Sequence, residues 1–333
     1  MPLRHPIPIG SPVLDDVRAV VERSRHVRTD LARIAETAAW MAYEELPFPD
    51  FGLPLWVGDG ADAAVDFVMT STAINTAFTD FATGVKFQVE YGGRTWSDSL
   101  AMFACLKRAL DAGAPLFDGA FLARVTRAEL AGIFVGNIEM PMLDEKRQAL
   151  NEVGAVLEAR YDGSFHRFVG SCSPRLYDDG RGMVDRLVRE FPRFDDVSPY
   201  GGREVRFYKL AQLGYWMLHA GLRGHGGFRI DDIGAMTAFA DYIVPAALRV
   251  LRILVYSPEL DAAISAGVPI ARDSEEEVEI RAHTLHATAL LCEEINALRP
   301  PELQVIIPQI DARLWGAYHA THWPHHLTRT TMY

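Results

Sequence analysis

The stretch from Phe207 to Leu251 reads FYKLAQLGYWMLHAGLRGHGGFRIDDIGAMTAFADYIVPAALRVL and is the most apolar long run of the chain. Two charged residues within it, Lys209 and Asp241, stand among apolar residues, and those around Lys209 recur at helical spacing. The glycine-rich segment Gly221 to Gly227 predicts a break between two helices. We therefore predict a helix, a hairpin and a second helix over about residues 205–255, with one lysine and one aspartate facing inward.

Two interpretations of this inward-facing pair follow from the pattern. Charged groups rarely enter a protein core without a partner of opposite charge. Lys209 and Asp241 are therefore either a structural ion pair that closes the helix hairpin or a catalytic pair. The residue pattern alone leaves both interpretations open.

The charge balance argues against a nucleic-acid polymer as the main partner. The chain has 33 Lys and Arg against 44 Asp and Glu, which gives a net charge of −11. Binding to a phosphate backbone depends on clustered Lys and Arg that release counterions. A single nucleotide is still compatible with this composition, because one local pocket can be basic on an acidic protein.

Cysteine usage predicts a reducing compartment. Cys105, Cys172 and Cys292 are far apart and odd in number, and no C-x-x-C occurs. This is typical of a cytoplasmic protein and not of a disulfide framework or a zinc finger. The first ten residues show no signal-peptide pattern and no run of 18 apolar residues occurs, so we expect a cytoplasmic chain without a membrane partner.

Helical patterns dominate the rest of the sequence. Residues Val85 to Trp96 are the exception, because apolar and polar residues alternate there around Gly92-Gly93, which predicts a β-hairpin. Helices are predicted at about residues 97–111, 127–135, 143–160, 182–190, 205–221 and 274–297. We therefore expect one mainly α globular domain over residues 1–333, with a small β element.

Histidines cluster late in the chain without a metal-binding pattern. His283 and His286 share a helix face with Glu279, and four more histidines follow near the end, at positions 319, 322, 325 and 326. No H-E-x-x-H occurs, and no H-x-E is followed by C-x-x-C. We therefore expect neither a metal nor another cofactor, and His325 and His326 are instead candidate donors to an anion.

Blocks in conserved order along nearly the whole chain resemble the queuosine salvage family, the queuosine 5′-phosphate N-glycosylases/hydrolases. The most specific blocks are F-Y-K-x-A-Q from Phe207, F-A-D-Y-x-x-P from Phe239 and E-V-E-I-R from Glu277. The other blocks are SRHV from Ser24, GRTWS from Gly93, RALD from Arg108, PML from Pro141 with Glu145 and Arg147, LNE from Leu150 with Gly154, Phe191-Pro192, and Asp311 with Leu314-Trp315. The element around Asp241 also resembles the catalytic element of helix-hairpin-helix DNA glycosylases.

The resemblance implies both a fold and a reaction. It implies a mainly α fold related to helix-hairpin-helix DNA glycosylases. It also implies hydrolysis of the N-glycosidic bond of queuosine 5′-monophosphate, or of a related 7-deazaguanine nucleotide or nucleoside, which releases queuine for salvage into tRNA. Asp241 would stabilise the ribosyl cation and accept a proton from water, while Lys209 would keep Asp241 ionised. Lys209 could instead attack the sugar as a nucleophile.

The resemblance also suggests which residues contact the substrate. We predict substrate contacts at Asn75, Phe78, Tyr208, Asp311, Trp315, His326, Arg329 and Tyr333. Asp311 would accept hydrogen bonds from the amidine edge of a guanine-like base, on which an aromatic ring, Trp315 or Phe78, would stack. The group His326, Arg329 and Tyr333 would hold the phosphate.

Three departures from the family pattern leave the base open. Ile243 stands where the family usually has Arg, Ala246 stands where it usually has Gln, and the N-F-x-F-W block is reduced to Asn75-Thr76-Ala77-Phe78. A glycosylase for a different modified purine nucleotide is one alternative. A non-enzymatic binder of a modified base or of tRNA, and a metal-dependent hydrolase built on the histidines, are two others.

Overall fold

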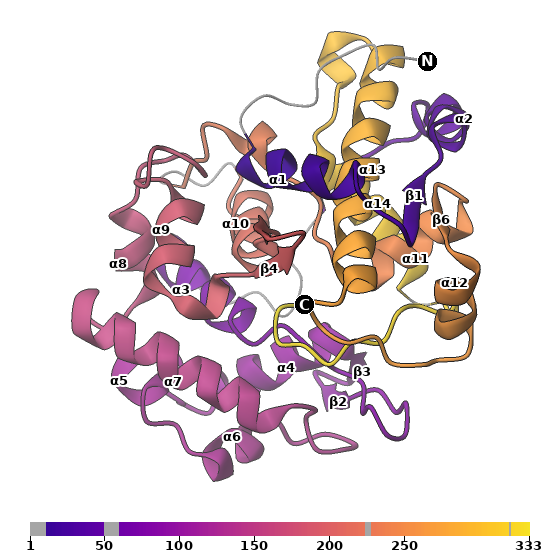
Figure 1. The fold of residues 1–333 in the computed structure, drawn as a ribbon. Helices are drawn as coiled ribbons and strands as arrows, with labels where there is room; N and C mark the ends of the chain where they lie inside the picture. Colours follow the sequence, from indigo (N-terminus) through magenta and orange to yellow (C-terminus); the bar gives the residue numbers. More distant parts are fainter. Residues whose placement is uncertain (1–10, 50–59, 224–227, 320) are drawn as a thin grey trace. The chain divides into compact units, whose positions relative to one another are not determined.

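The computed structural model describes residues 11–49, 60–223, 228–319 and 321–333. These residues form fourteen α-helices, α1 to α14, and three two-stranded antiparallel ribbons (Figure 1). The prediction of a mainly α protein with a small β element is therefore confirmed.

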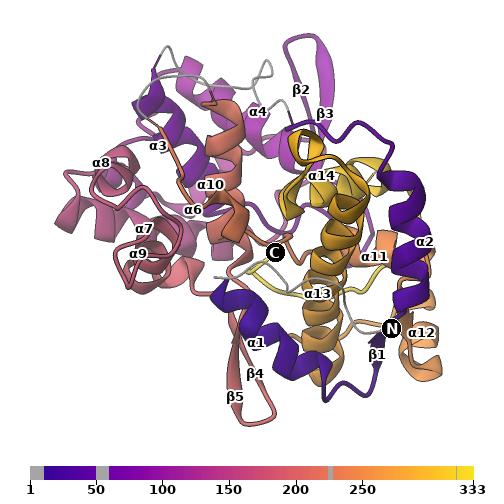
Figure 2. The same cartoon turned by 90° about the horizontal axis from the view of Figure 1, so that it is seen from above.

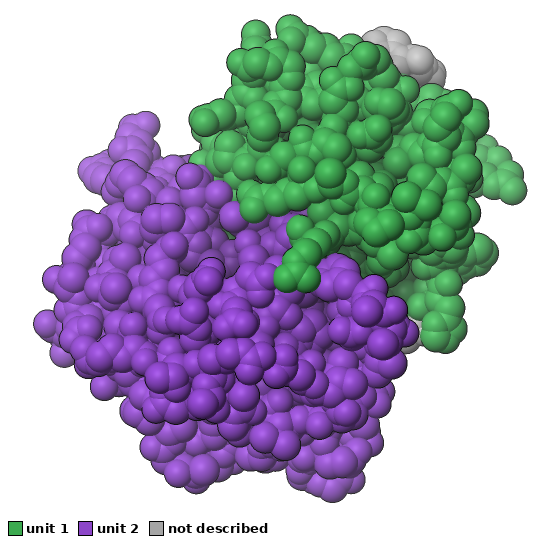
Figure 3. Space-filling model, turned by 60° about the horizontal axis from the view of Figure 1, so that its bottom comes forward, with its two compact units in different colours: residues 1–49, 196–212, 232–329 green, residues 50–195, 213–231, 330–333 purple. Residues whose placement is uncertain are grey.

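The chain folds into two compact units, each built from separate stretches of sequence (Figure 3). Unit 1 comprises residues 1–49, 196–212 and 232–329. Unit 2 comprises residues 50–195, 213–231 and 330–333. Each unit is described by itself below, and a single domain over the whole chain stays a prediction.

Unit 1 is built around one long helix, α13 (Glu275–Leu298) (Figures 1 and 2). The side chain of its N-cap residue, Ser274, accepts from the Glu277 amide at 3.3 Å. Four helices pack against it: α1 (Pro12–Val21), α2 (Leu31–Met41), α11 (Ile243–Val250) and α14 (Ile307–Tyr318). The unit also contains α12 (Pro258–Ser265) and the strand pairs β1 (Val27–Thr29) with β6 (Leu254–Tyr256) and β4 (Val197–Tyr200) with β5 (Arg203–Arg206).

A buried carboxylate on α13 holds the chain between α1 and β1. The Glu279 side chain is fully buried and accepts from the backbone amides of Arg25, His26 and Val27 at 2.7 to 3.1 Å. The Tyr200 hydroxyl donates to the same carboxylate at 2.8 Å. Glu279 therefore replaces the water that these amides would otherwise bind, which is why a charge is tolerated in this core.

Unit 2 contains one long helix on which two short helices pack. The long helix α7 (Leu143–Arg160) packs on the short helices α5 (Gly119–Leu122) and α6 (Arg127–Ile133). A Cβ at Gly154 on α7 would collide with the backbone of α5, so glycine is needed for this close approach. The unit also contains α3 (Ala61–Thr72), α4 (Asp98–Asp111), α8 (Phe165–Gly170), α9 (Met183–Glu190) and the short 3₁₀ helix η1 (Pro192–Phe194).

The predicted hairpin is confirmed in unit 2. Strand β2 (Gln88–Tyr91) pairs with β3 (Arg94–Ser97). The two glycines of the turn, Gly92 and Gly93, have φ values of 61° and 74°, a conformation that side chains disfavour.

The element around Asp241 differs from the prediction. Helix α10 (Lys209–Gly221) begins later than expected because the preceding residues form β5. The connection between α10 and α11 comprises residues 222–242 and is therefore longer than a hairpin turn. Residues 224–227 of the predicted turn lie outside the described residues. Asp241 precedes α11, because side chains bind the backbone just before it and hold it outside a helix.

We expect Glu279→Gln to lower the free energy of unfolding by about 2–4 kcal/mol, because a buried charged acceptor of several amides is replaced by a neutral one. Glu275→Gln, one turn earlier on the same helix and half exposed, is the matched control and should change it by less than about 0.5 kcal/mol. Urea unfolding of both variants measures the difference. Similar losses in the two variants would contradict the role assigned to Glu279.

Candidate active site

The ammonium of Lys209 lies almost buried at the start of α10. The residue is 6% exposed. Asp196 shapes the turn before it, since its carbonyl accepts from the amides of Phe207 and Tyr208 and its carboxylate accepts from the amide of Lys209 at 3.1 Å. Tyr208 has a φ of 51°, which lets the chain turn sharply into the helix. Among the described residues, no hydrogen bond reaches the Lys209 Nζ.

The carboxylate of Asp241 lies just ahead of α11 and is oriented by its backbone. Its Oδ1 accepts from the amides of Ile243 at 2.8 Å and Val244 at 3.0 Å. These amides belong to the first turn of the helix, where the helix dipole favours a negative charge. Within the described part of the chain, Oδ2 has no hydrogen-bond partner. One oxygen of Asp241 is therefore fixed, and the other is available to a substrate.

Three buried side chains fix the extended segment that carries Asp241. The Gln212 side chain accepts from the Thr237 amide at 2.9 Å. The Asp311 carboxylate accepts from the Phe239 amide at 2.8 Å. Arg281 donates to the Ala240 carbonyl at 3.3 Å.

Arg281 also binds the segment that carries Lys209. Its guanidinium donates to both oxygens of Asp196, at 3.0 and 2.5 Å, and its side chain is 2% exposed. The same guanidinium lies over the Phe207 ring, 4.0 Å from its centroid. A single arginine on α13 therefore fixes both the lysine and the aspartate segments. Sequence reasoning placed Arg281 in a family block but assigned it no role.

Lys209, Asp241 and Asp311 form one electrostatic cluster. Burial lowers the pKa of Lys209, against the attraction of Asp241, Asp311 and Asp196. Burial raises the pKa of Asp241, and Lys209 together with the two amides opposes that rise. Burial and the charge of Asp241 raise the pKa of Asp311 well above its usual range. The positive charge of Lys209 thus opposes the rise that burial causes in the pKa of both carboxyl groups.

We expect the charged ends of Lys209 and Asp241 to lie within hydrogen-bond to ion-pair reach, and in the structure they form no direct ion pair. Their charges influence one another, but no ion pair within 4.0 Å joins them among the described residues. The Asp241 carboxylate turns instead toward the amides of α11. This favours the catalytic interpretation, since two charges buried for stability alone would gain most from direct contact.

The other predicted substrate contacts of unit 1 have distinct surroundings. Trp315 stacks on His319, with ring centroids 4.2 Å apart, so one face of the indole is already covered. His326 is buried, and burial lowers the pKa of its imidazole to about 3, so it is neutral at physiological pH. Arg329 is exposed and Tyr208 is partly buried. Within this group, Arg329 therefore carries the positive charge.

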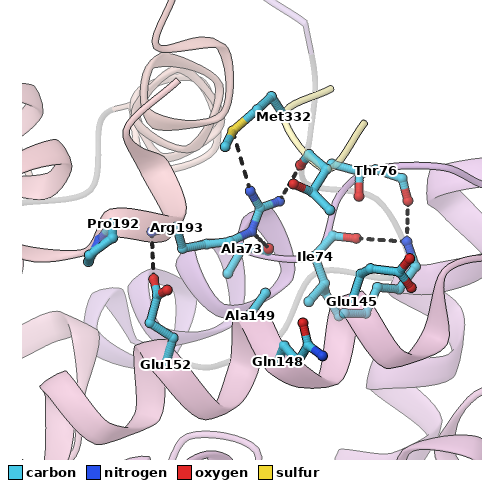
Figure 4. Close-up of a pocket in the computed structure, with 12 residues that line it drawn as sticks. Ala73, Ile74, Thr76, Glu145, Gln148, Ala149, Glu152, Pro192, Arg193 and Met332 are labelled. Carbon is cyan, nitrogen blue, oxygen red and sulfur yellow. Dashed lines mark hydrogen bonds between the residues drawn. The ribbon is translucent and has the colours of Figure 1, made fainter. Parts of the chain in front are cut away.

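The three predicted contacts of unit 2 are neighbours in sequence of residues that line a cavity of about 220 Å³, among them Ile74, Thr76 and Met332 (Figure 4). Lys146 donates to the carbonyls of Ile74, Thr76 and Ala77, beyond the end of α3, and its ammonium lies 4.9 Å from the ring centroid of Phe78. Asn75 belongs to the same loop. Lys146 therefore shapes the loop that carries Asn75 and Phe78, which is a role that sequence reasoning missed.

Arg193, on the same cavity wall, holds the last residues of the chain. Its Nε donates to the Ala73 carbonyl at 2.5 Å and its Nη2 donates to the Thr331 carbonyl at 2.7 Å (Figure 4). The Glu152 carboxylate accepts from the Arg193 amide at 2.6 Å. Tyr333, two residues after Thr331, is buried. The cavity cations thus bind carbonyls and position two predicted substrate-contact segments.

The histidines that the structure describes do not assemble with other metal ligands. Across the described residues, no group of three or more His, Cys, Asp or Glu side chains is arranged to hold a metal ion. The His283 Nδ1 instead lies 2.8 Å from the Thr29 hydroxyl, and burial lowers the pKa of this imidazole to about 3. None of the described helices is both long and apolar enough to cross a membrane.

A mainly α fold, a carboxylate bound by backbone amides and a nearly buried lysine coupled to it define the candidate site. Comparison with known proteins gives the family. Residues 57–333 match the family described as Queuosine salvage protein, and the chain belongs to this family.

Named relatives span bacteria and animals. A protein of Sphaerobacter thermophilus named queuosine 5′-phosphate N-glycosylase/hydrolase is 36% identical over 96% of this chain and 97% of its own length. A Mus musculus protein of the same name is 29% identical over 90% of this chain and 91% of its own. The name of both relatives describes hydrolases that act on N-glycosyl compounds.

We expect Lys209→Met to raise the pKa of Asp241, because the positive charge that opposes its burial is removed. A carbon NMR titration of the aspartate carboxyl groups, assigned with Asp241→Asn, measures the shift. Arg33→Met, which removes an exposed cation on α2, is the control. An unchanged pKa of Asp241 in Lys209→Met would show that the charge of Lys209 does not act on Asp241.

Proposed function

We propose that the protein hydrolyses the N-glycosidic bond of queuosine 5′-monophosphate and releases the queuine base for salvage into tRNA. The observation that carries the proposal is the Lys209–Asp241 arrangement: a nearly buried ammonium and a carboxylate oxygen, neither with a hydrogen-bond partner among the described residues, held on segments that Arg281 fixes. The names of the relatives supply the substrate.

Asp241 has the main chemical role in this proposal. Cleavage of a glycosidic bond passes through an oxocarbenium-like cation at the anomeric carbon. The free Oδ2 of Asp241 stabilises that cation and accepts the proton of the attacking water. The amides of Ile243 and Val244 keep the carboxylate ionised and oriented before the substrate arrives.

Lys209 and Asp311 support the reaction from the same cluster. Lys209 keeps Asp241 ionised despite its burial. The Oδ2 of Asp311 is bound by the Phe239 amide, and no hydrogen bond from a described residue reaches Oδ1. Oδ1 is thus available to accept from the amidine edge of a guanine-like base, with Trp315 four residues further along α14 as a stacking partner for the base.

The departures from the family pattern bear on the base and not on the bond that is broken. Ile243 is partly exposed and directly follows the Asp241 segment, and Ala246 lies in the next turn of α11. Their apolar side chains replace an arginine and a glutamine that could contact polar groups of the base. The alternative to queuine is a different 7-deazaguanine base. Chromatography of the base released from queuosine and guanosine 5′-monophosphates distinguishes the two possibilities.

A small nucleotide rather than a nucleic-acid polymer is the proposed partner, given the net charge of −11. The three cysteines are free, with Cys105 and Cys292 buried, and we place the reaction in the cytoplasm.

We expect Asp241→Asn to lower turnover by roughly a hundredfold or more, because it removes the charge that stabilises the cation and the base that accepts the proton. Substrate binding should persist, since the carboxylate acts mainly in the transition state. Turnover, substrate binding and melting temperature are measured on the same sample. Asp15→Asn, at an exposed position on α1, is the matched control. A poorly folded but active Asp241→Asn protein would instead support the structural ion pair.

We expect Arg329→Met to raise KM for the 5′-monophosphate by about tenfold to a hundredfold, because one charge-assisted hydrogen bond is lost. KM for the free nucleoside should stay unchanged. The reason is that His326 is neutral and leaves Arg329 as the cation of this group. Arg28→Met, which also removes an exposed arginine, is the control. If the unmodified protein used the nucleotide and the nucleoside equally well, the segment that carries Arg329 would not be a phosphate-binding segment.

A further inference from the structure

His325 packs on the segment that carries Asp241 and has no role in the reaction proposed above. Its imidazole stacks on the ring of Tyr242, the residue after Asp241, with centroids 4.6 Å apart and planes inclined by 31°. It is close enough to Asp241 for its charge to stabilise the ionised carboxylate. The side chain is partly exposed, unlike that of its neighbour His326.

Hydrogen bonding determines which ring nitrogen of His325 can act. Its Nδ1 lies 2.9 Å from the carbonyl oxygen of His326, and a carbonyl can only accept, so Nδ1 carries a hydrogen. Within the described residues, no hydrogen bond reaches Nε2. The opposite edge of the ring is therefore the one that can give or take a proton.

The backbone on both sides of His325 is fixed. Arg249 on α11 donates to the Pro324 carbonyl at 3.2 Å. The Ile270 amide donates to the Leu327 carbonyl at 2.8 Å, and this contact forms a parallel bridge to the segment before α13. The imidazole is thus held by contacts on either side, as expected of a group that must meet a substrate in one geometry.

The proposed substrate needs a proton donor that Asp241 and Lys209 do not provide. A 7-deazapurine lacks N7, the atom at which purines are commonly protonated when they leave. Asp241 must be ionised to stabilise the ribosyl cation, and the charge of Lys209 is needed to keep it so. The base would otherwise depart as an anion, and a positioned acid lowers that barrier by about 10²–10⁴-fold in rate.

We propose that His325 is the general acid that protonates the departing base through Nε2, an inference that rests on the proposed function. As the C1′–N9 bond breaks, its electron pair passes to the base and the Nε2 proton of the imidazolium is transferred to it, at N9 or N3. Water adds to C1′ and gives its proton to Asp241. The products are ribose 5-phosphate and the neutral base, and solvent restores the proton of His325 and removes that of Asp241.

The test compares two leaving groups. Queuosine 5′-monophosphate needs a proton on its leaving base, whereas 4-nitrophenyl β-D-ribofuranoside 5-phosphate releases a stable phenolate without one. We expect His325→Gln to lower kcat on the first substrate by about 10²–10⁴-fold and to retain the second within about threefold. Asp241→Asn should lose both activities, because the cation is common to both. His322→Gln, at an exposed histidine of the same segment, should retain both.

Each other result overturns the assignment. Equal losses of kcat on the two substrates would make His325 an electrostatic or structural group, and a rise in KM on both substrates with kcat unchanged would make it a ligand of the phosphate that they share. No loss on either substrate would remove it from the site. Failure of the proposed function itself is distinct, because Asp241→Asn would then retain activity or the unmodified protein would cleave neither substrate.

Discussion

The buried pairing of Arg281 with Asp196 is the interaction on which the geometry of the site depends. Asp196 shapes the turn into α10 and Arg281 binds the Ala240 carbonyl, so this one pair connects the lysine segment to the aspartate segment. Breaking a buried ion pair on one side costs about 3–5 kcal/mol, because an unpaired charge remains. The pair is therefore a strong constraint on how far the Lys209 and Asp241 segments can move apart.

In the cluster that this pair supports, the described residues do not satisfy every polar atom. Arg281 and Asp196 satisfy each other at both oxygens, as expected of charges buried for structure. Lys209 and Asp241 do not contact each other directly, and each keeps polar atoms that no described residue binds. Burying such groups costs free energy that a structural role would not repay. A substrate that carries polar groups and develops positive charge is the natural complement.

The sequence predicted the charged residues of this site better than their arrangement. Lys209 and Asp241 stood out as candidates because charges within a long apolar run are rare. The helix α7 and the hairpin over β2 and β3 followed from periodicity and glycine placement. The extended backbone before Asp241 could not be predicted, because side chains remote in sequence impose it: Asp311 lies 72 residues from Phe239, and Arg281 lies 41 residues from Ala240 and 85 from Asp196.

His325 illustrates the same limit in chemical terms. Adjacent histidines at positions 325 and 326 look equivalent in the sequence, which predicts both as donors to an anion. Burial makes His326 neutral, while His325 is partly exposed, stacks on Tyr242 and has its Nδ1 next to the His326 carbonyl. Whether an imidazole can carry a proton into a reaction is decided by desolvation and by the partner of its other nitrogen. Both are properties of the packed segment, which Arg249 and Ile270 hold in place.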